Sequence, residues 1–369
     1  MRHRRSRSGG SSSRSPTSRC AASVSGACGP FTSPSFPFRL PPRSRVAVVA
    51  PSKGRCDLVH ERRRHRIPAW SLLAGAAALL MAIAAVWWTE GALIAPANHP
   101  IGPPPGDLHA EPVEFRTDDN ELLRGWFAQG DLPKGGVVLL HGVRSDRRSM
   151  VDRARFLTSS GYSVVLFDLQ AHGESPGERI TFGYRESGGA RAAIRYLRRR
   201  VPGQRVGAIG ASLGGAACLL GRQPLDVDAL VLEAVYPDVR QAAMNRLRLR
   251  FGPMGEWLAP VLTIPLETRL GIRAGDLRPI DGIRGVRSPV LVIGGTQDRR
   301  TTASETRALF DAAPDPKELW LIEGAAHVDF YRYAAEEYRR RILEFLRRHL
   351  DGRQGSTRQE IAGAVGYIL

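Results

Sequence analysis

The sequence predicts an α/β protein with a mostly parallel central sheet flanked by helices, a small helical cap insertion, and one transmembrane helix ahead of the sheet. Three observations predict this architecture. Short apolar runs alternate with helical stretches from Glu111 onward, which is the pattern of successive β-α units. A Gly-x-Ser-x-Gly pentapeptide directly follows one of these runs, and a 21-residue stretch without a charged residue precedes them all.

The basic charge of the chain is concentrated in residues 1–66. That segment holds 15 Lys and Arg against two acidic residues, a net +13, which leaves 38 basic and 34 acidic residues, a net +4, in the remainder. Its Ser-, Arg-, Pro- and Gly-rich composition predicts a disordered tail; a second interpretation is that translation starts later, near Val59. Because the remainder is nearly neutral, we do not expect nucleic-acid binding.

Residues 67–89 are predicted to form a transmembrane anchor. The uncharged residues 68–88 would extend about 31 Å as a helix, which matches the hydrocarbon core of a bilayer. Arginines cluster at 62–66, so the positive-inside rule places the N-terminus in the cytoplasm and the rest outside. We therefore expect a single-pass protein of the cytoplasmic membrane with an extracytoplasmic domain. The alternative is a secretory signal peptide cleaved near Ala95-Pro96-Ala97, although the apolar run is longer than usual.

Residues 90–110 are expected to be a Pro-rich linker. Five prolines fall within 95–106, so this part should form neither helix nor sheet and act as a stiff spacer.

Residues 111–350 are predicted to form one domain. Expected strands, beginning with an antiparallel hairpin, are 112–115, 122–127, 136–140, 163–167, 205–209, 229–232, 290–293 and 318–322. Expected helices are 147–159, 184–199, 213–220, 304–313 and 331–350. Continuous apolar runs are typical of strands that are covered on both faces.

Residues suited to nucleophilic catalysis follow the ends of several predicted strands. Gly210 and Gly214 flank Ser212 and would allow the sharp strand-to-helix turn that exposes a nucleophilic serine. A serine hydroxyl needs a base to take its proton, and His327 is our candidate. Asp298 would orient this histidine, with Glu233 as the rival for the acid.

On these residues, the chain resembles the α/β-hydrolase superfamily over residues 111–350. The order Ser212, Asp298, His327 matches the superfamily's catalytic triad, and the His141-Gly142 pair resembles its oxyanion loop. The resemblance implies that the backbone N–H groups of Val143 and Leu213 stabilise the oxyanion.

One nearby motif departs from the superfamily pattern. The stretch from Asp168 is similar to Asp-x-Arg-Gly-His-Gly-x-Ser, but Gln170 and Ala171 stand where Arg and Gly are usual. We expect His141 and His172 to order loops through hydrogen bonds to the backbone rather than to act in catalysis.

Residues 236–280 interrupt the strands where the superfamily places a cap. Apolar residues of this segment could form an acyl-binding wall or simply pack the cap onto the domain. Its arginines could meet anionic head groups, although a solvated face is the default interpretation. They are Arg240, Arg246, Arg248 and Arg250.

The predicted function is a membrane-tethered serine hydrolase that cleaves a small carboxylic ester or thioester through an acyl-enzyme, with no metal and no organic cofactor. Peptide or amide hydrolysis by the same triad is the alternative, and a non-catalytic binding module is a third hypothesis. A dienelactone-type enzyme would need Cys, and a haloalkane dehalogenase Asp, in place of Ser212. Cys218 is expected to be a buried helical residue, and the tail 351–369 has no predicted role.

Overall fold

The computed structural model of the chain describes residues 68–256, 260 and 267–351. The predicted tail at 1–66, residues 352–369 of the tail predicted at 351–369, and the cap residues 257–259 and 261–266 lie outside the described residues. The chain divides into two units, residues 1–65 and 66–369, and everything described below belongs to the second.

Eight strands form one sheet in the order β10-β9-β8-β7-β4-β5-β3-β2. Only the pairs β2–β3 and β3–β5 are antiparallel, so the sheet is mostly parallel, as predicted. The strands are β2 (Ala110–Arg116), β3 (Leu122–Ala128), β4 (Gly136–Leu140), β5 (Ser163–Phe167), β7 (Val206–Ala211), β8 (Ala229–Glu233), β9 (Val290–Gly295) and β10 (Lys317–Ile322).

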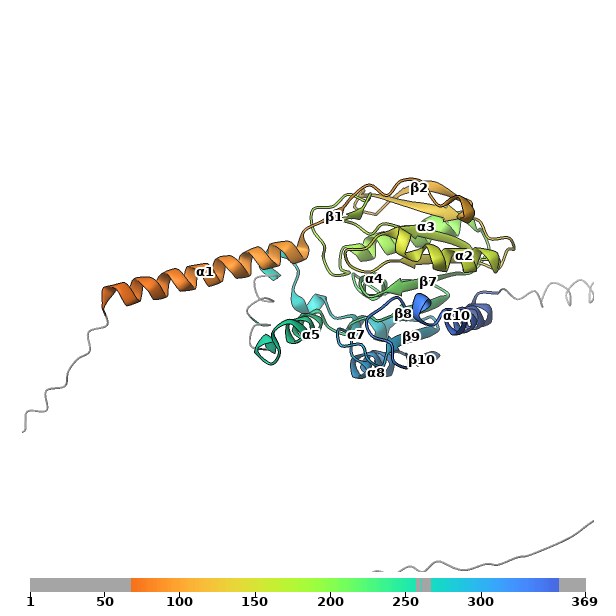
Figure 1. Cartoon of the computed structure of the whole chain (residues 1–369). Coiled ribbons are helices and arrows are strands. Elements are labelled where there is room, and N and C mark those ends of the chain that lie inside the picture. The colour runs from red at the N-terminus through yellow and green to blue at the C-terminus, as the bar shows by residue number, and fades with distance from the viewer. Residues whose placement is uncertain (1–67, 257–259, 261–266, 352–369) are drawn as a thin grey trace, which may run out of the picture. The chain divides into compact units, whose positions relative to one another are not determined.

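Helices flank this sheet (Figure 1). The α-helices that the structure describes, including those that do not flank the sheet, are α1 (Ala69–Ile94), α2 (Val151–Ser159), α3 (Glu186–Arg200), α4 (Leu213–Leu219), α5 (Val239–Phe251), α7 (Pro279–Gly282), α8 (Ala303–Ala312), α9 (Phe330–Tyr333) and α10 (Ala335–His349). The single helix predicted at 331–350 is divided between α9 and α10, because Ala334 leaves the helical conformation with φ −137° and ψ 51°.

The central strands are buried on both faces. Val138 and Leu140 of β4 belong to the core layer that contains α3 and α4. Their neighbours Val137 and Leu139 belong to the opposite layer, with α2 and α10. Because successive side chains of a strand point to opposite faces, each central strand must be apolar at every position, which explains its continuous apolar run.

Helix α1 presents an apolar surface. Trp70, Leu73 and Trp88 are each more than 70% exposed, and its last residue, Ile94, is buried in the domain core. Over the part of the chain that the structure describes, no helix is long and apolar enough to cross a membrane. The side chains of residues 69, 82, 86, 89 and 90 of α1 lie outside that part, so the predicted span at 67–89 falls only partly within it.

The linker differs from the prediction that residues 95–106 form neither helix nor sheet. Ala97–Asn98 form a short strand, β1, which pairs in parallel with β6 (His172–Gly173). The backbone N–H of Ala97 donates to Ala171 O at 2.8 Å, and that of His99 to Gly173 O at 2.9 Å. The prolines at 96 and 100 flank these donors without replacing either, so this strand can form within a Pro-rich segment.

The cap predicted at 236–280 begins with α5, which Asp238 caps by accepting from Arg240 N at 2.7 Å. Leu249 and Phe251, in the last turn of α5, and Met254, just after this helix, are exposed, whereas Leu270 is buried. The described part of the cap therefore contains both packed and exposed apolar side chains.

Candidate active site

The carboxyl ends of the parallel strands bring the predicted site residues to one edge of the sheet. His141 directly follows β4, Asp168 follows β5 and Ser212 follows β7. Asp298 and His327 lie on the loops after β9 and β10. Residues separated by up to 186 positions in the sequence therefore share one edge, where ligands of α/β proteins generally bind.

Ser212 occupies a strained turn between β7 and α4. Its backbone has φ 48° and ψ −106°, a conformation that side-chain-bearing residues rarely adopt. Two backbone hydrogen bonds hold it there: Ser212 N–H donates to Glu233 O at 2.7 Å, and Ala216 N–H donates to Ser212 O at 3.0 Å. The neighbouring strand and the first turn of α4 thus fix the position of the hydroxyl.

The two glycines of the pentapeptide are required by close packing. A Cβ at Gly210 would lie 2.6 Å from Gly215 N, and a Cβ at Gly214 would lie 2.4 Å from Leu140 O. Cβ atoms do not approach backbone atoms this closely. Neither glycine has a positive φ, so the requirement comes from space rather than from backbone conformation. Cys218, on the following helix, is fully buried and donates to Gly214 O at 3.2 Å.

His327 and Asp298 form a hydrogen-bonded pair. His327 Nδ1–H donates to Asp298 Oδ2 at 2.7 Å, which leaves Nε2 as the basic nitrogen of the neutral ring. The other oxygen of Asp298 accepts from the backbone N–H groups of Arg300 (2.8 Å) and Thr301 (2.9 Å). The carboxylate is therefore held from both sides and fixes the tautomer and orientation of the imidazole.

Glu233, the rival for the acid, is engaged elsewhere. Its carboxylate accepts from Arg153 Nη2 at 2.7 Å and from Arg153 Nε at 3.2 Å, and the hydroxyl of Tyr338 also donates to it. The structure thus places Asp298, and not Glu233, against the histidine.

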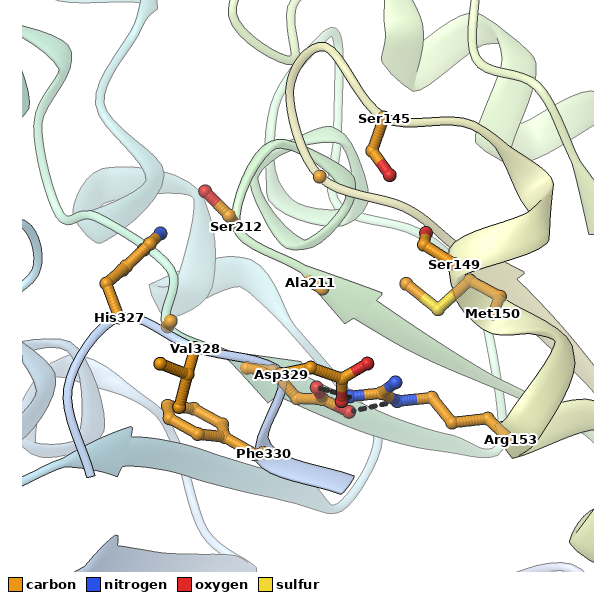
Figure 2. Close-up of a pocket in the computed structure, with 13 residues that line it drawn as sticks. Ser145, Ser149, Met150, Arg153, Ala211, Ser212, His327, Val328, Asp329 and Phe330 are labelled. Carbon is orange, nitrogen blue, oxygen red and sulfur yellow. Dashed lines mark hydrogen bonds and ion pairs between the residues drawn. The ribbon is translucent and has the colours of Figure 1, made fainter. Parts of the chain in front are cut away.

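Ser212 and His327 line the same cavity of about 180 Å³. In Figure 2, a ring nitrogen of His327 is turned toward the side of the pocket that holds the Ser212 hydroxyl. Ser212 is 8% exposed and the His327 side chain 19% exposed, so both are accessible to a small substrate.

The two residues predicted to bind the oxyanion each follow a residue that lines the cavity: Val143 follows Gly142, and Leu213 follows Ser212. Within the described part of the chain, neither Val143 N–H nor Leu213 N–H has a hydrogen-bond acceptor. Leu213 begins α4, where the first amides of a helix lack partners, and Gly142, next to Val143, lines the cavity with Ser212. Neither amide is therefore occupied by the described part of the chain.

Sequence reasoning did not identify Arg153 as part of this site. Its side chain is only 3% exposed and forms ion pairs with Glu233 and with Asp329. Burial lowers the pKa of Arg153, but these acidic neighbours outweigh burial and raise it well above its ordinary value. The sequence signal that could have identified it is an arginine at helical spacing between the apolar residues Met150 and Leu157, which places it on the buried face of α2.

His141 and His172 form hydrogen bonds with the backbone of the loops that contain them. His141 Nε2 accepts from Leu169 N–H at 3.0 Å, so Nδ1 carries the proton and donates to Gly142 O at 2.8 Å. His172 Nδ1 donates to Gln170 O at 2.9 Å, while its Nε2 is buried without a partner. Burial lowers the pKa of each histidine to about 4, so both rings are neutral at pH 7.

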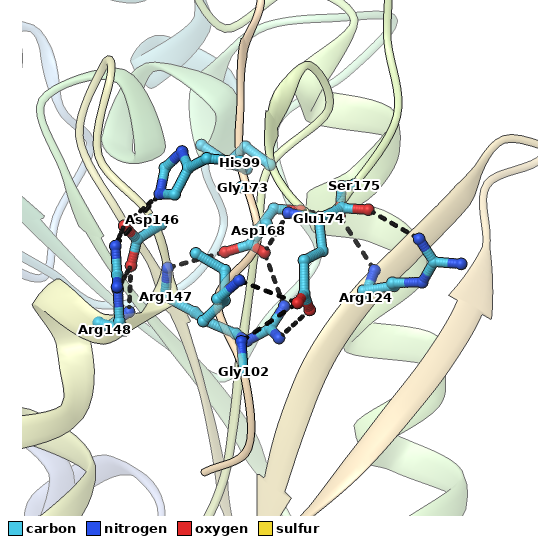
Figure 3. A network of polar contacts seen from close by, with 12 residues as sticks. His99, Gly102, Arg124, Asp146, Arg147, Arg148, Asp168, Gly173, Glu174 and Ser175 are labelled. Carbon is cyan, nitrogen blue, oxygen red and sulfur yellow. Dashed lines mark hydrogen bonds and ion pairs between the residues drawn. The ribbon is translucent and has the colours of Figure 1, made fainter. Parts of the chain in front are cut away.

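The loop that departs from the superfamily motif is held by buried charges (Figure 3). Arg147 Nη1 donates to Asp168 Oδ2 at 2.6 Å, and its Nη2 pairs with Glu174. Glu174 in turn accepts from the linker amides of Ile101 (2.9 Å) and Gly102 (3.2 Å). The linker is thus attached to the loop after β5, in which Ala171 has a positive φ of 60°.

Comparisons with known proteins agree with this geometry. A family model described as serine aminopeptidase, S33, matches residues 131–281. The chain is similar to the uncharacterized protein YqkD of Bacillus subtilis, at 25% identity over 57% of this chain and 70% of that one. It is also similar to YfhR of Escherichia coli, at 26% identity over 68% and 84%.

Among solved structures, the Pyrococcus furiosus esterase Pf2001 is similar at 26% identity with a TM-score of 0.58, over 70% of this chain and 98% of that one. The sheet order, the strained serine between β7 and α4 and these similarities agree with one another. The chain is therefore a hydrolase of the α/β-hydrolase superfamily.

Proposed function

We propose that the protein is a serine hydrolase that cleaves carboxylic esters or thioesters through an acyl-enzyme on Ser212. The observation that carries the proposal is the His327–Asp298 hydrogen bond of 2.7 Å beside a serine held on a strained turn. The similarity to the Pyrococcus esterase supports the choice of an ester.

In the first half-reaction, Ser212 Oγ attacks the carbonyl carbon and passes its proton to His327 Nε2. The carbonyl oxygen becomes an oxyanion, which accepts hydrogen bonds from Val143 N–H and Leu213 N–H. When the tetrahedral intermediate collapses, the bond to the leaving group breaks and His327 returns the proton to that group. The product of this half-reaction is acyl-Ser212 with a released alcohol or thiol.

In the second half-reaction, His327 Nε2 takes a proton from water, whose oxygen attacks the acyl carbon. Collapse then returns the proton to Ser212 Oγ and releases the carboxylic acid. Asp298 stabilises the imidazolium that forms in each half-reaction.

The Ser212→Ala variant tests this mechanism. It should lose both ester turnover, by about 10⁴-fold or more in kcat, and labelling by a fluorophosphonate probe, because each requires the hydroxyl. Ser159→Ala is the matched control, since the Ser159 hydroxyl donates to a backbone oxygen of α2, away from the pocket. Full labelling of Ser212→Ala would show that another residue is the nucleophile.

Peptide or amide hydrolysis is the second candidate, and the description of the matching family model favours it. The same residues would perform either reaction. A panel that compares aminopeptidase substrates with acyl esters and thioesters separates the two by their kcat/KM values.

We also propose that α1 tethers the enzyme to the cytoplasmic membrane with the catalytic domain outside. The charge-free sequence from Pro68 to Trp88 and the exposed apolar side chains of α1 support this tether. Arginines at 62–66, before it, support the orientation.

The test of the tether is the distribution of the full chain after cells are lysed and membranes washed with alkaline carbonate. We expect the protein in the membrane pellet, and a variant that lacks residues 68–90 in the supernatant. Protease added to spheroplasts should degrade the catalytic domain of the full chain. Recovery of the full chain in the supernatant would refute the tether, and protection from protease would refute the orientation.

A further inference from the structure

The floor of the catalytic cavity contains charged groups that the proposed reaction does not use. Arg153, Glu233 and Asp329 line the cavity together with Ser212 and His327. Figure 2 shows Arg153 and Asp329 on the side of the pocket away from the Ser212 hydroxyl, and Glu233 pairs with Arg153 at 2.7 Å. A group attached to the reacting carbonyl would therefore meet them.

The guanidinium of Arg153 has one unused nitrogen. Nε donates to Glu233 and to the Tyr338 hydroxyl, and Nη2 pairs with Glu233 and with Asp329 at 2.9 Å. Nη1 has no acceptor among the described residues. It is also not fully buried. Figure 2 shows a guanidinium nitrogen directed into the pocket and free of dashed lines. The cavity therefore contains an unused hydrogen-bond donor.

An unused acceptor lies beside this donor. Asp329 Oδ1 accepts from Arg153 Nη2 and from Tyr331 N–H at 3.0 Å. Its Oδ2 accepts no hydrogen bond from the described residues, and the side chain is 29% exposed. The hydroxyl of Ser145, on the cavity wall, likewise has no partner within the described part of the chain.

The charges decide which chemical group matches these atoms. One arginine and two carboxylates give the cavity floor a formal net charge of −1. An anionic group of the substrate would therefore be repelled. An alkyl group would leave both the donor and the acceptor unpaired after water is displaced, which is unfavourable. A hydroxyl group accepts from Nη1, donates to Asp329 Oδ2 and adds no charge.

We propose that this cavity binds an uncharged, hydroxylated part of the substrate, such as a polyol or hydroxyalkyl group next to the scissile bond. The inference rests on the proposed ester hydrolysis. The hydroxylated part could belong to the alcohol or to the acyl side of the ester, since both adjoin the carbonyl carbon.

The experiment measures kcat/KM of the full chain on two sets of three matched esters. On the alcohol side, 2,3-dihydroxypropyl butyrate is compared with propyl butyrate and with the anionic carboxymethyl butyrate. On the acyl side, propyl 3-hydroxybutyrate is compared with propyl butyrate and with propyl hemisuccinate. On one of the two sides we expect the hydroxylated ester to be preferred over the alkyl ester by roughly tenfold, mainly through KM, and the anionic ester to be the poorest.

Two variants then tie the preference to the cavity. Asp329→Asn removes one negative charge and keeps a side chain that can cap α9, so the penalty on the anionic ester should fall by roughly tenfold. Ser145→Ala removes only the hydroxyl and should reduce the preference for the hydroxylated ester. Asp238→Asn is the matched control, because it changes the cap of α5 outside the cavity and should leave the ratios unchanged.

The inference would be overturned if the hydroxylated and the alkyl ester had equal kcat/KM values on both sides. It would also be overturned if Asp329→Asn and Asp238→Asn changed the ratios of kcat/KM between the esters in the same way. Turnover of propyl butyrate that depends on Ser212 distinguishes this failure from a failure of the proposed function, in which no ester is cleaved. If Asp329→Asn does not fold by circular dichroism, the Ser145→Ala ratios decide.

Discussion

At Gly214, the space for a side chain is filled by the carbonyl of Leu140 at the end of β4. A methyl group there would lie 2.4 Å from the carbonyl oxygen, so α4 would have to move away from the sheet and carry the Ser212 turn with it. We expect Gly214→Ala to lower the free energy of unfolding by about 1–3 kcal/mol and to reduce ester turnover.

Gly275→Ala is the control for this substitution, because a Cβ there meets nothing within 4 Å. Urea unfolding and kcat should both be near the wild-type values in this control. Wild-type stability in Gly214→Ala would show that the interface between α4 and β4 relaxes without strain.

The two acidic candidates illustrate what a sequence can decide about single residues. Asp298 follows β9 and Glu233 is the last residue of β8, so both lie near the carboxyl ends of strands, where the sequence favoured Asp298 and left Glu233 as its rival. Only the fold places Arg153 beside Glu233 and His327 beside Asp298. These are contacts between residues 80 and 29 positions apart, and local sequence does not encode them.

At the scale of elements, the loop after β5 depends on one buried ion pair. Asp168 is fully buried and Arg147 is 3% exposed on its side chain. Substitution Arg147→Met would leave the carboxylate buried without its cation, which generally costs about 3–5 kcal/mol. It would also remove the stacking of the guanidinium on Trp126, at 4.6 Å from the ring centroid.

Chemical denaturation of Arg147→Met checks this expectation. The control is Arg195→Met, whose ion pair with Asp118 is exposed on both sides and should contribute less than about 1 kcal/mol. A loss in Arg147→Met no larger than in the control would mean that water solvates Asp168 once the arginine is removed.

The central strands were predicted closely because burial on both faces requires continuous apolar runs, which stand out in a sequence. The linker was mispredicted because its short strand depends on two amides, those of Ala97 and His99, and on acceptors at Ala171 and Gly173. Because prolines flank this strand on both sides, local sequence propensity does not predict it. The departure at Gln170 and Ala171 is accommodated by a loop that the buried Arg147 anchors.

For the molecule as a whole, two buried neutral histidines predict acid sensitivity. The pKa values of His141 and His172 fall to about 4 on burial, against about 6.5 in an unfolded chain. Between pH 6.5 and 4, the unfolded chain therefore binds protons that the folded chain does not. As the pH is lowered through this window, the free energy of unfolding should decrease by about 1.4 kcal/mol per pH unit for each histidine. Above pH 6.5 it should not depend on the two histidines.

Urea unfolding at several pH values tests this dependence. His172→Asn should have a slope that is smaller by about the contribution of one histidine. His109→Asn, at an exposed residue, should keep the wild-type slope. An unchanged slope in His172→Asn would show that His172 is not responsible for the proton uptake.

The sequence by itself determined where the main strands and helices of the α/β-hydrolase domain follow one another along the chain. It also determined the candidate residues Ser212, Asp298 and His327. It could do so because apolar periodicity and the glycines of a tight turn are local requirements. Only the tertiary structure decided which carboxylate contacts the histidine, how the linker joins the domain, and that Arg153 and Asp329 form the cavity floor. Those features arise from contacts between residues distant along the chain, and the packing of the sheet and its helices sets them.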